Sequence, residues 1–346
     1  MILVTGGAGF IGSNFVLDWL ADSAEPVVNL DKLTYAGNRE NLQSLQGDSR
    51  HILVEGDICD AGLLQQLLAR YKPRAIVNFA AESDVGRSIF AAEKFIQSNV
   101  VGVFRLLEAA RSYWMAMPEG EKSGFRFLQV STDEVYGSLG PAESAFNEKD
   151  RYEPNSPYAA SKASADHLVR ASHRTYGLPV LTTNCANNYG PRQFPEKLIP
   201  LMITYALEGK TLPVYGDGLQ VRDWLYVGDH CKAIRMVLGA GRPGETYNVG
   251  CQGERANIEV VRAICALLDE MKPRANSSYA ALIKNVADRP GHDTRYAIDS
   301  SKIAQELGWR AGQSFEAGLR KTVGWYIGNP AWVSNIKERI HAEDPA

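Results

Sequence analysis

The chain has 346 residues, of which 45% are hydrophobic and 22% charged, a balance typical of a globular protein with one large domain or two modest ones. Its 37 basic and 40 acidic residues leave a formal charge of −3, which excludes an overall field that would recruit nucleic acid or an anionic membrane. Five scattered cysteines without metal-ligand spacing, and a strand-like start MILVTGG, indicate a cytoplasmic protein with no secretory segment, membrane span or metal site.

Short β-rich runs alternate with amphipathic runs of helix length through the first half of the chain. In chain order we expect strands at MILVT, PVVNL, HILVEG, RAIVNFA, FRFLQVS and PVLTTN, and helices over residues 13–21, 61–71, 94–113 and 157–176. Strands separated by helices form right-handed βαβ units. The sequence therefore predicts an α/β protein with a doubly wound parallel sheet of the Rossmann type.

The second half is less regular and richer in glycine and proline. Its expected helices, over residues 198–207, 228–238, 258–271 and 314–326, are separated by the loops NNYGPRQFPEK, PVYGDGLQVRD and ADRPGHDTRY. We expect residues 1–186 to form the sheet domain. Residues 187–346 would form mainly a smaller substrate-binding lobe, with some chain crossing back to the sheet.

A glycine-rich turn follows the first strand. TGGAGFIG carries Gly7, Gly9 and Gly12 in G-x-G-x-x-G spacing, together with Gly6, and opens the amphipathic run FIGSNFVLDWL, so a helix N-terminus would face a pyrophosphate. Asp31, nineteen residues past Gly12, ends the next strand, where it can bind both ribose hydroxyls of NAD and would repel the extra phosphate of NADP. The sheet domain is therefore predicted to bind NAD. The alternative is a glycine-rich turn with a solvated aspartate.

Two adjacent acids end the strand FRFLQV, in the stretch VSTDEVYGS. Asp133 and Glu134 repel each other and lose hydration in a dry site, so a purely structural reason for them is weak. The alternative is a solvated acidic turn, because most acidic residues lie at the surface.

A tyrosine and a lysine share one face of an expected helix. Tyr158 and Lys162 in SPYAASK are four residues apart, about one helical turn. To act as a base near neutral pH, Tyr158 needs a pKa that falls from about 10 to about 7. A nearby ammonium and a positive nicotinamide ring would together lower it. The alternative is an exposed pair without a role.

Over nearly its whole length the sequence resembles the extended short-chain dehydrogenase/reductases, and among them most closely the family of dTDP-glucose 4,6-dehydratases. The motifs that carry the resemblance are TGGAGFIGSNF, DKLTYAGN, AAES, VSTDEVYG, SPYAASKA, TNCANNYGP, FPEKLIP, RDWLYV and DRPGHD. The paired acids are the discriminating feature. Related nucleotide-sugar epimerases keep a Thr or Ser before VYG but lack both acids.

The resemblance implies an NAD-dependent lyase that converts dTDP-D-glucose to dTDP-4-dehydro-6-deoxy-D-glucose. Tyr158, helped by Lys162 and Thr132, would take the C4 hydroxyl proton while hydride passes to NAD. The resulting ketone makes C5–H acidic enough for Glu134 to remove its proton, and protonated Asp133 would give a proton to the departing C6 hydroxyl. NADH would then return its hydride to C6. Two neighbouring carboxyl groups favour opposite protonation states, because the negative charge of one raises the pKa of the other.

The resemblance also implies two sets of binding residues. The cofactor set is Gly6, Gly7, Gly9, Phe10, Ile11, Gly12, Asp31, Lys32, Leu33, Thr34, Asp57, Ile58, Ala80, Ala81, Ser98, Tyr158, Lys162 and Asn188. The substrate set is Ser83, Thr132, Asn187, Lys197, Leu198, Pro213, Tyr215, Arg222, Asn257, Arg289 and His292. Arg222 and Arg289 would bind the diphosphate, and Tyr215 would stack on the base.

The implied partner is a small-molecule nucleotide sugar, with neither nucleic acid nor a membrane. Similar enzymes are homodimers, and by that analogy the helices over residues 94–113 and 157–176 would be the packing surface.

Some positions depart from the family pattern. Asp84 and Gly86 stand in DVGRS where HVDRS is usual, Arg192 stands where an aromatic is commoner, and Ser98 replaces a threonine. Two alternatives follow. A UDP-sugar 4-epimerase would use the same tyrosine and NAD but leave both acids without a task, and a catalytically silent NAD-binding sensor would retain the fold without the chemistry.

Overall fold

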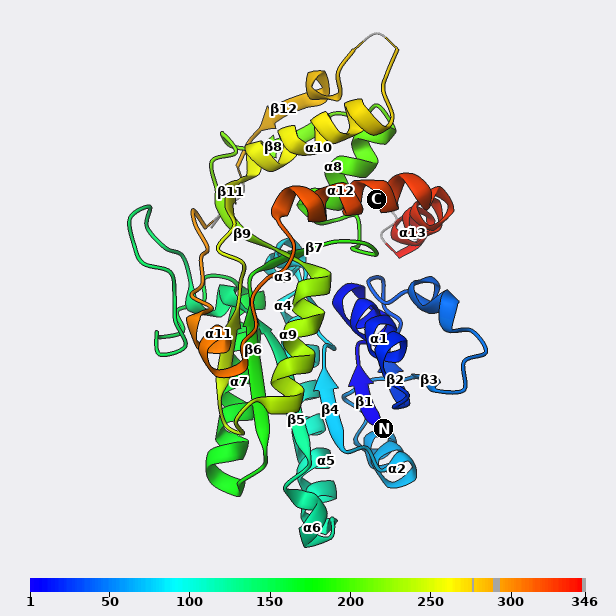
Figure 1. Cartoon of the computed structure of the whole chain (residues 1–346), viewed down its shortest axis with the longest axis vertical. Helices are drawn as coiled ribbons and strands as arrows, with labels where there is room; N and C mark the ends of the chain where they lie inside the picture. The colour runs from blue at the N-terminus through cyan, green and yellow to red at the C-terminus, as the bar shows by residue number, and fades with distance from the viewer. Residues whose placement is uncertain (276, 289–292, 344–346) are drawn as a thin grey trace.

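The computed structural model describes residues 1–275, 277–288 and 293–343. Its centre is a seven-stranded sheet in the order β10-β6-β5-β4-β1-β2-β3, in which every neighbouring pair is parallel. Helices cover both faces of this sheet (Figure 1). The predicted doubly wound α/β fold is therefore confirmed. The strands are β1 (Ile2–Thr5), β2 (Val27–Asp31), β3 (His51–Glu55), β4 (Ala75–Asn78), β5 (Arg126–Thr132), β6 (Val180–Cys185) and β10 (Thr246–Val249).

The two helical layers bury alternate residues of the strands. Ile2 and Val4 of β1 pack with Phe15 in one hydrophobic cluster, whereas Leu3 packs with Leu106 in the other. Successive side chains of a strand point to opposite faces, so a strand covered on both sides must be apolar throughout. The helices around the sheet are α1 (Phe10–Asp22), α2 (Ala61–Tyr71), α3 (Val85–Phe90), α4 (Ala92–Phe95), α5 (Val103–Ala116), α6 (Glu119–Lys122), α7 (Pro157–Tyr176), α9 (Val227–Ala240) and α11 (Ser301–Leu307).

Helix α7 has clear local start and stop signals. The Ser156 hydroxyl accepts a hydrogen bond from the Ala159 N–H at 3.0 Å, and Pro157 occupies the first helical turn. The helix ends at Gly177, whose φ of 76° is a left-handed conformation that glycine adopts without strain. The expected helix over residues 157–176 therefore matches the observed one.

A smaller lobe lies beyond the carboxyl ends of the strands, at the top of Figure 1. It contains a three-stranded sheet, β11-β9-β7, and a two-stranded sheet, β12-β8. Its own core includes Tyr189, Ile264, Leu319 and Trp332. Its elements are β7 (Asn187–Tyr189), α8 (Leu198–Leu207), β8 (Leu212–Tyr215), β9 (Val221–Tyr226), β11 (Glu254–Ala256), α10 (Asn257–Met271), η4 (Tyr279–Leu282), β12 (Ile283–Val286), α12 (Phe315–Gly328) and α13 (Pro330–Glu343).

Part of the second half lies in the large sheet rather than in the lobe. Strand β10 pairs with β6, so the chain does return to the sheet after residue 187. The exact division into residues 1–186 and 187–346 stays a prediction.

The sequence analysis was wrong about two loops. Residues 187–197 and 213–223, expected as loops, contribute β7, part of β8 and the start of β9. These strands are short and lie among glycines and prolines, so their alternation of apolar and polar residues is too brief to recognise. They form because they pair with strands that are distant in sequence. The third expected loop, residues 287–296, lies partly outside the described residues. The helix expected over 94–113 starts at Ala92 and contains a wider π-helical segment, η2 (Ile96–Gly102).

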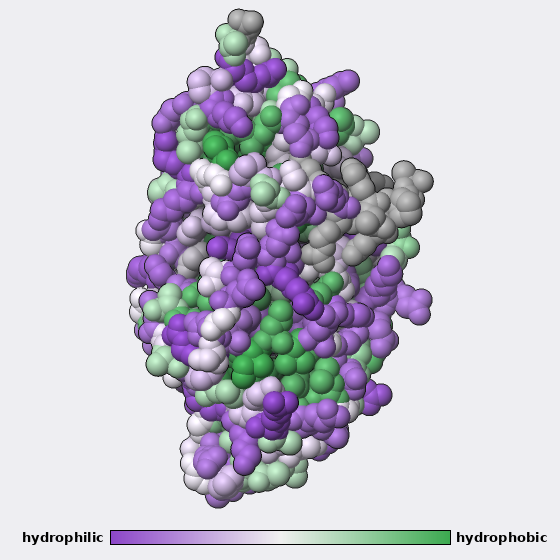
Figure 2. All heavy atoms as spheres, turned by 90° about the vertical axis from the view of Figure 1, so that its right-hand side faces the viewer, coloured by the Kyte–Doolittle hydropathy of each residue, from purple (hydrophilic) through white to green (hydrophobic). Residues whose placement is uncertain are grey.

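Figure 2 shows the side of the molecule on which β3 is the edge strand of the sheet. Hydrophobic residues gather below the middle of this face, and most of the remaining surface is hydrophilic. None of the helices in the described part of the chain combines the length and apolar character needed to cross a membrane.

Candidate active site

A cavity of about 290 Å³ lies at the carboxyl ends of the central strands. It is lined by the turn after β1 and by residues from the ends of β2, β4 and β5, from α7 and from the segment that follows β6. In open α/β sheets ligands bind at this edge. The cavity therefore lies between the sheet and the smaller lobe.

The glycine-rich turn forms one wall of the cavity. Gly6 has a φ of 71°, and a Cβ atom there would lie 2.5 Å from the Ala80 nitrogen. A Cβ atom on Gly12 would lie 2.2 Å from the Gly6 carbonyl oxygen. Only glycine fits such contacts, so the backbone closely approaches the cavity, and α1 begins beside it without a side-chain cap.

Asp31 lies at the end of β2, on the same side of the cavity. Its carboxylate accepts backbone hydrogen bonds from Ala8 and Leu33, both at 2.8 Å, which fixes its orientation. Burial raises the pKa of Asp31, and these two hydrogen bonds oppose the rise. The neighbouring Lys32 ammonium pairs with Asp57 at 2.7 Å and so is not a free phosphate ligand. The glycine cradle and the oriented carboxylate fit NAD better than NADP.

The paired acids follow β5 in a short 3₁₀ helix, η3 (Asp133–Tyr136). The Thr132 hydroxyl accepts a hydrogen bond from the Glu134 N–H at 3.3 Å and lies 3.3 Å from Asp133 Oδ1. Glu134 lines the cavity, whereas Asp133 does not line it, is 1% exposed and has no partner for Oδ2 among the described residues. Burial first, and then the carboxylates of Glu134 and Asp223, raise the pKa of Asp133 well above its usual value. These surroundings therefore favour the protonated form of Asp133.

Tyr158 and Lys162 both line the cavity from α7. The Lys162 ammonium donates a hydrogen bond to the Val130 carbonyl at 2.8 Å. Burial, and next the negative charge of Glu134, raise the pKa of Tyr158 well above its usual value, although a hydrogen bond with Thr132 opposes the rise. Burial and the charge of Glu134 thus keep Tyr158 protonated, and the shift that a base needs requires positive charge, from the Lys162 ammonium and from a bound cofactor.

The cavity gathers most of the residues expected to act in catalysis or to bind the cofactor, and some of the substrate set. The expected residues that line it are Gly6, Gly9, Phe10, Ile11, Gly12, Asp31, Lys32, Thr34, Asp57, Ile58, Ala80, Ala81, Ser83, Ser98, Thr132, Glu134, Tyr158, Lys162, Asn187, Asn188 and Lys197. The described residues of these sets that do not line it are Gly7, Leu33, Asp133, Leu198, Pro213, Tyr215, Arg222 and Asn257. Arg289 and His292 lie outside the described residues.

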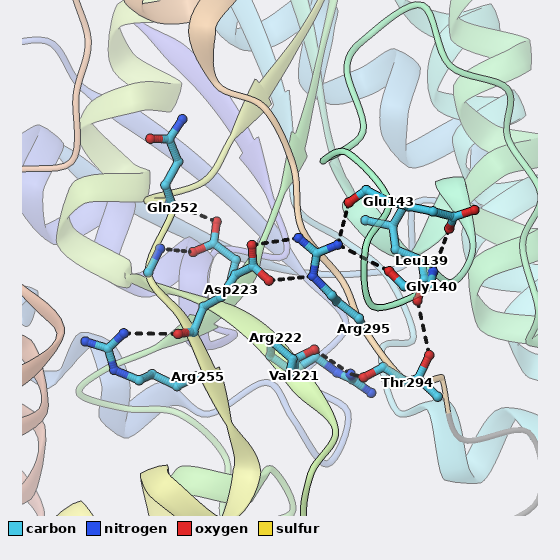
Figure 3. A network of polar contacts seen from close by, with 12 residues as sticks. Leu139, Gly140, Glu143, Val221, Arg222, Asp223, Gln252, Arg255, Thr294 and Arg295 are labelled. Atoms are coloured by element: carbon cyan, nitrogen blue, oxygen red, sulfur yellow. Dashed lines mark hydrogen bonds and ion pairs between the residues drawn. The ribbon is translucent and has the colours of Figure 1, made fainter.

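Arg222 does not line the cavity, although its charge acts on Asp133. Its guanidinium donates to the carbonyls of Val221 at 2.7 Å and Asp293 at 2.8 Å, and it lies 4.4 Å from the centre of the Tyr296 ring. Figure 3 shows Arg222 and Val221 beside Thr294 in this network. In this arrangement Arg222 binds the backbone of Asp293, a few residues after the expected diphosphate ligand Arg289. The role of Arg222 as a diphosphate ligand stays a prediction.

The sequence analysis missed several residues at the cavity, including Glu82, Gln193, Phe194 and Glu196. Burial raises the pKa of Glu196 to about 7, although Lys197, whose ammonium lies 4.0 Å away, lowers it. The sequence feature that could have identified Glu196 is its position in the motif FPEK, directly before the expected substrate ligand Lys197.

The altered residue Asp84 lies near this group. Its carboxylate accepts the Arg87 N–H at 2.6 Å, which caps α3, and lies 3.9 Å from the Lys197 ammonium. The Lys197 ammonium also donates to the Ser83 carbonyl at 2.8 Å. Asp84 thus has a local structural role as an N-cap residue.

The fold, the glycine cradle and the Thr, Tyr and Lys side chains around one cavity define a dehydrogenase-like protein of the extended short-chain type. Residues 3–322 match the family described as GDP-mannose 4,6 dehydratase, and the chain belongs to this family. It is 61% identical over 335 residues to the dTDP-glucose 4,6-dehydratase of Xanthomonas campestris pv. campestris, covering 96% of this chain and 95% of that protein. The resemblance expected from the motifs is therefore confirmed.

Solved structures agree with this assignment. The dTDP-glucose 4,6-dehydratase of Streptomyces venezuelae, crystallised with NAD and TYD bound, superposes with a TM-score of 0.88 at 48% identity, covering 97% of this chain and 99% of that one. A UDP-glucose 4-epimerase of Thermus thermophilus, in complex with NAD, has a TM-score of 0.82 at 29% identity, covering 95% and 99%. The fold is thus shared with epimerases, while the sequence is much nearer to the dehydratases.

Proposed function

We propose that the protein catalyses the NAD-dependent dehydration of dTDP-D-glucose to dTDP-4-dehydro-6-deoxy-D-glucose, as a hydro-lyase. The observation that carries the proposal is the placement of the two acids. Glu134 lines the cavity that Tyr158 and Lys162 also line, and the adjacent Asp133 is buried, with a pKa raised well above its usual value. Elimination of water needs one base and one acid, and these two carboxyl groups can provide both.

The residues of the chain would divide the reaction between them. Bound NAD supplies the hydride acceptor for C4 and the hydride donor for C6. Tyr158 takes the C4 hydroxyl proton, with Thr132 orienting that hydroxyl and Lys162 providing positive charge. Glu134 removes the C5 proton, which the C4 ketone acidifies, and Asp133 protonates the C6 hydroxyl, so that water leaves. Glu134 would then return a proton to C5 as hydride is added at C6, which completes the 6-deoxy product.

The competing functions make different use of the same residues. A UDP-sugar 4-epimerase would need Tyr158 and NAD but no elimination, and it would leave the raised pKa of Asp133 without purpose. An NAD-binding sensor would have no need of the acids, the tyrosine or the lysine. Neither alternative uses all of the residues that the cavity brings together.

The test is incubation of the purified protein with dTDP-glucose and, separately, with UDP-glucose, followed by measurement of 4-keto-6-deoxy product. Product from dTDP-glucose without added NAD is expected, because the cofactor is regenerated in each cycle. Epimer formation without water loss would move the assignment to the epimerase. Tight NAD binding without any product would favour the sensor.

We further propose a homodimer in the cytoplasm, packed through α5 and α7. Ile96 and Phe104 are 47% and 42% exposed on the helical segment η2–α5, and Tyr176 is 48% exposed on α7, so apolar side chains are available on these helices. Sedimentation should give twice the chain mass, and Phe104→Asp should reduce it to the monomer. A monomer at all concentrations in the unmodified protein would contradict the proposal.

A further inference from the structure

Three successive residues at the end of β5 contact three residues on one face of α7. The Val130 carbonyl accepts from the Lys162 ammonium at 2.8 Å, and the Ser131 hydroxyl donates to Asp166 Oδ2 at 2.5 Å. The next residue of the strand, Thr132, forms the hydrogen bond with Tyr158 described above. Tyr158, Lys162 and Asp166 are spaced four residues apart, so they form one row along the helix. The proposed reaction uses the first two members of this row and not the third.

Asp166 lies in the protein interior. Its residue is 5% exposed, as against 4% for Lys162, and its Oδ1 atom has no hydrogen-bond partner among the described residues. A buried carboxylate is costly unless an opposite charge compensates it. The ammonium one helical turn away is such a charge, so the two groups depend on each other.

The electrostatics of the row agree with its geometry. Burial raises the pKa of Asp166 to about 7, while Lys162 and the Ser131 hydrogen bond lower it. Burial lowers the pKa of Lys162, and Asp166 raises it. The charge on Lys162 is thus sensitive to Asp166.

Glu134 and Asp133 face Tyr158, at one end of the row. The other titratable groups that face Lys162 and Asp166 come from three different parts of the chain. Cys185 on β6 faces Lys162, and burial raises the pKa of its thiol, so it is neutral. Tyr136 on η3 and Tyr152 in the following loop face Asp166, and burial raises both of their pKa values. All three groups are uncharged near neutral pH and cannot replace the carboxylate.

We propose that Asp166 is a positioning residue that acts through Lys162, its buried carboxylate keeping the ammonium charged while β5 holds that ammonium near Tyr158. The proposal rests on the proposed function. Asp166 itself exchanges no proton with the sugar. It supports the step in which Tyr158 takes the C4 hydroxyl proton, and the later elimination does not depend on it.

The test compares Asp166→Asn and Asp166→Glu with the unmodified protein in the pH dependence of kcat/KM. Asn retains an acceptor for Ser131 but removes the charge, so Lys162 loses its proton more easily and Tyr158 receives less help. The Asn variant should lose about tenfold in kcat/KM near neutral pH and regain activity at higher pH, because a one-unit change in a base's pKa corresponds to about a tenfold change in its active form. The Glu variant should keep the original profile, and KM should change little in either.

A second measurement does not depend on turnover. The carbon NMR shift of the Lys162 side chain, followed against pH, reports the pKa of its ammonium and should show a lower value in Asp166→Asn. Should Asp166→Asn fold poorly, Ser131→Ala removes the hydrogen bond that stabilises the carboxylate and should move the profile the same way by a smaller amount. Asp229→Asn, which alters a carboxylate buried on α9, is the matched control and should leave the profile unchanged.

The outcomes separate the two proposals. An unmodified protein that makes no 4-keto product contradicts the proposed function, and the Lys162 titration then still decides the role of Asp166. A productive enzyme whose pH profile and Lys162 pKa are unchanged by Asp166→Asn overturns the inference and leaves Asp166 a structural residue.

Discussion

Asp133 and Glu134 are adjacent in the chain, yet their carboxyl groups occupy different surroundings. Asp133 is 1% exposed and does not line the cavity, whereas Glu134 does. Burial and the nearby carboxylates raise the pKa of Asp133 well above its usual value. One turn of backbone thus gives two adjacent carboxyl groups different surroundings, and those of Asp133 favour its protonated form.

The first prediction concerns this pair of acids. The double variant Asp133→Asn, Glu134→Gln should preserve the shape of the site. It should leave the oxidation at C4 intact, because Tyr158, Lys162 and bound NAD are unchanged. With saturating dTDP-glucose, the double variant should accumulate enzyme-bound NADH and 4-keto-glucose, with little 6-deoxy product, as measured by absorbance and mass spectrometry. Loss of a general acid or base typically lowers the rate by about 10²–10⁴.

Tyr158→Phe is the comparison for that experiment. It removes the acceptor for the C4 proton and should block both halves, so neither NADH nor 6-deoxy product should build up. Undiminished 6-deoxy product from the double acid variant would exclude the proposed roles of Asp133 and Glu134.

The second prediction concerns cofactor choice. Asp31→Asn should weaken NAD binding about tenfold or more, because an amide cannot offer acceptors to Ala8, Leu33 and the ribose hydroxyls together. The measurement is the amount of NAD released from the purified protein. Asp22→Asn, which alters an exposed aspartate at the far end of α1 and outside the cavity lining, is the control and should retain NAD. Recovery of NADP from the unmodified protein would show that the role given to Asp31 is wrong.

The third prediction concerns the ion pair of Arg295 and Glu254. Arg295 pairs with Glu254 through two hydrogen bonds of 2.6 and 2.9 Å, and it donates to the Glu143 carbonyl at 2.8 Å. Figure 3 shows Arg295 between the loop of Gly140 and Glu143 and the strand that carries Asp223. Arg295→Met should lower the free energy of unfolding by about 1–2 kcal/mol, because it leaves these acceptors without a donor.

Denaturant unfolding of Arg295→Met, Glu254→Gln and the double variant gives the coupling energy of the pair. The double variant should be less destabilised than the sum of the single ones. Strict additivity would mean that the ion pair contributes nothing measurable.

The fourth prediction concerns pH and stability. The folded-state pKa of Glu196 is raised from 4.5 to about 7, so the folded protein binds this proton more tightly than the unfolded chain does. Stability therefore falls as the pH rises between these two values, and the destabilisation is fully present above about pH 7. Glu196→Gln should thus stabilise the protein at about pH 8, on the order of 1–3 kcal/mol, and have little effect near pH 4.

Urea unfolding of both proteins at the two pH values measures this difference. The comparison at low pH is the internal control, since Glu and Gln are then both uncharged. Equal stability of the two proteins at high pH would show that Glu196 ionises in the fold without cost.

Much of the fold was predictable because it depends on local signals. The strands of the sheet are short apolar runs, and α7 has Ser156, Pro157 and Gly177 at its ends, so each element can be recognised within its own sequence. The short strands of the lobe could not be recognised in this way. Strand β8, for example, forms by pairing with β12, about seventy residues further along the chain.

The sequence by itself determined the chemistry available to the site. The spacing of the glycines, the acid pair after a strand, and Tyr158 with Lys162 on one helical face are all local patterns, and a parallel sheet brings its carboxyl ends to one edge. Only the tertiary structure decided the state of each group. Burial and the carboxylates of Glu134 and Asp223 raise the pKa of Asp133, and burial raises that of Glu196. Both shifts depend on packing against distant parts of the chain, which no local pattern specifies.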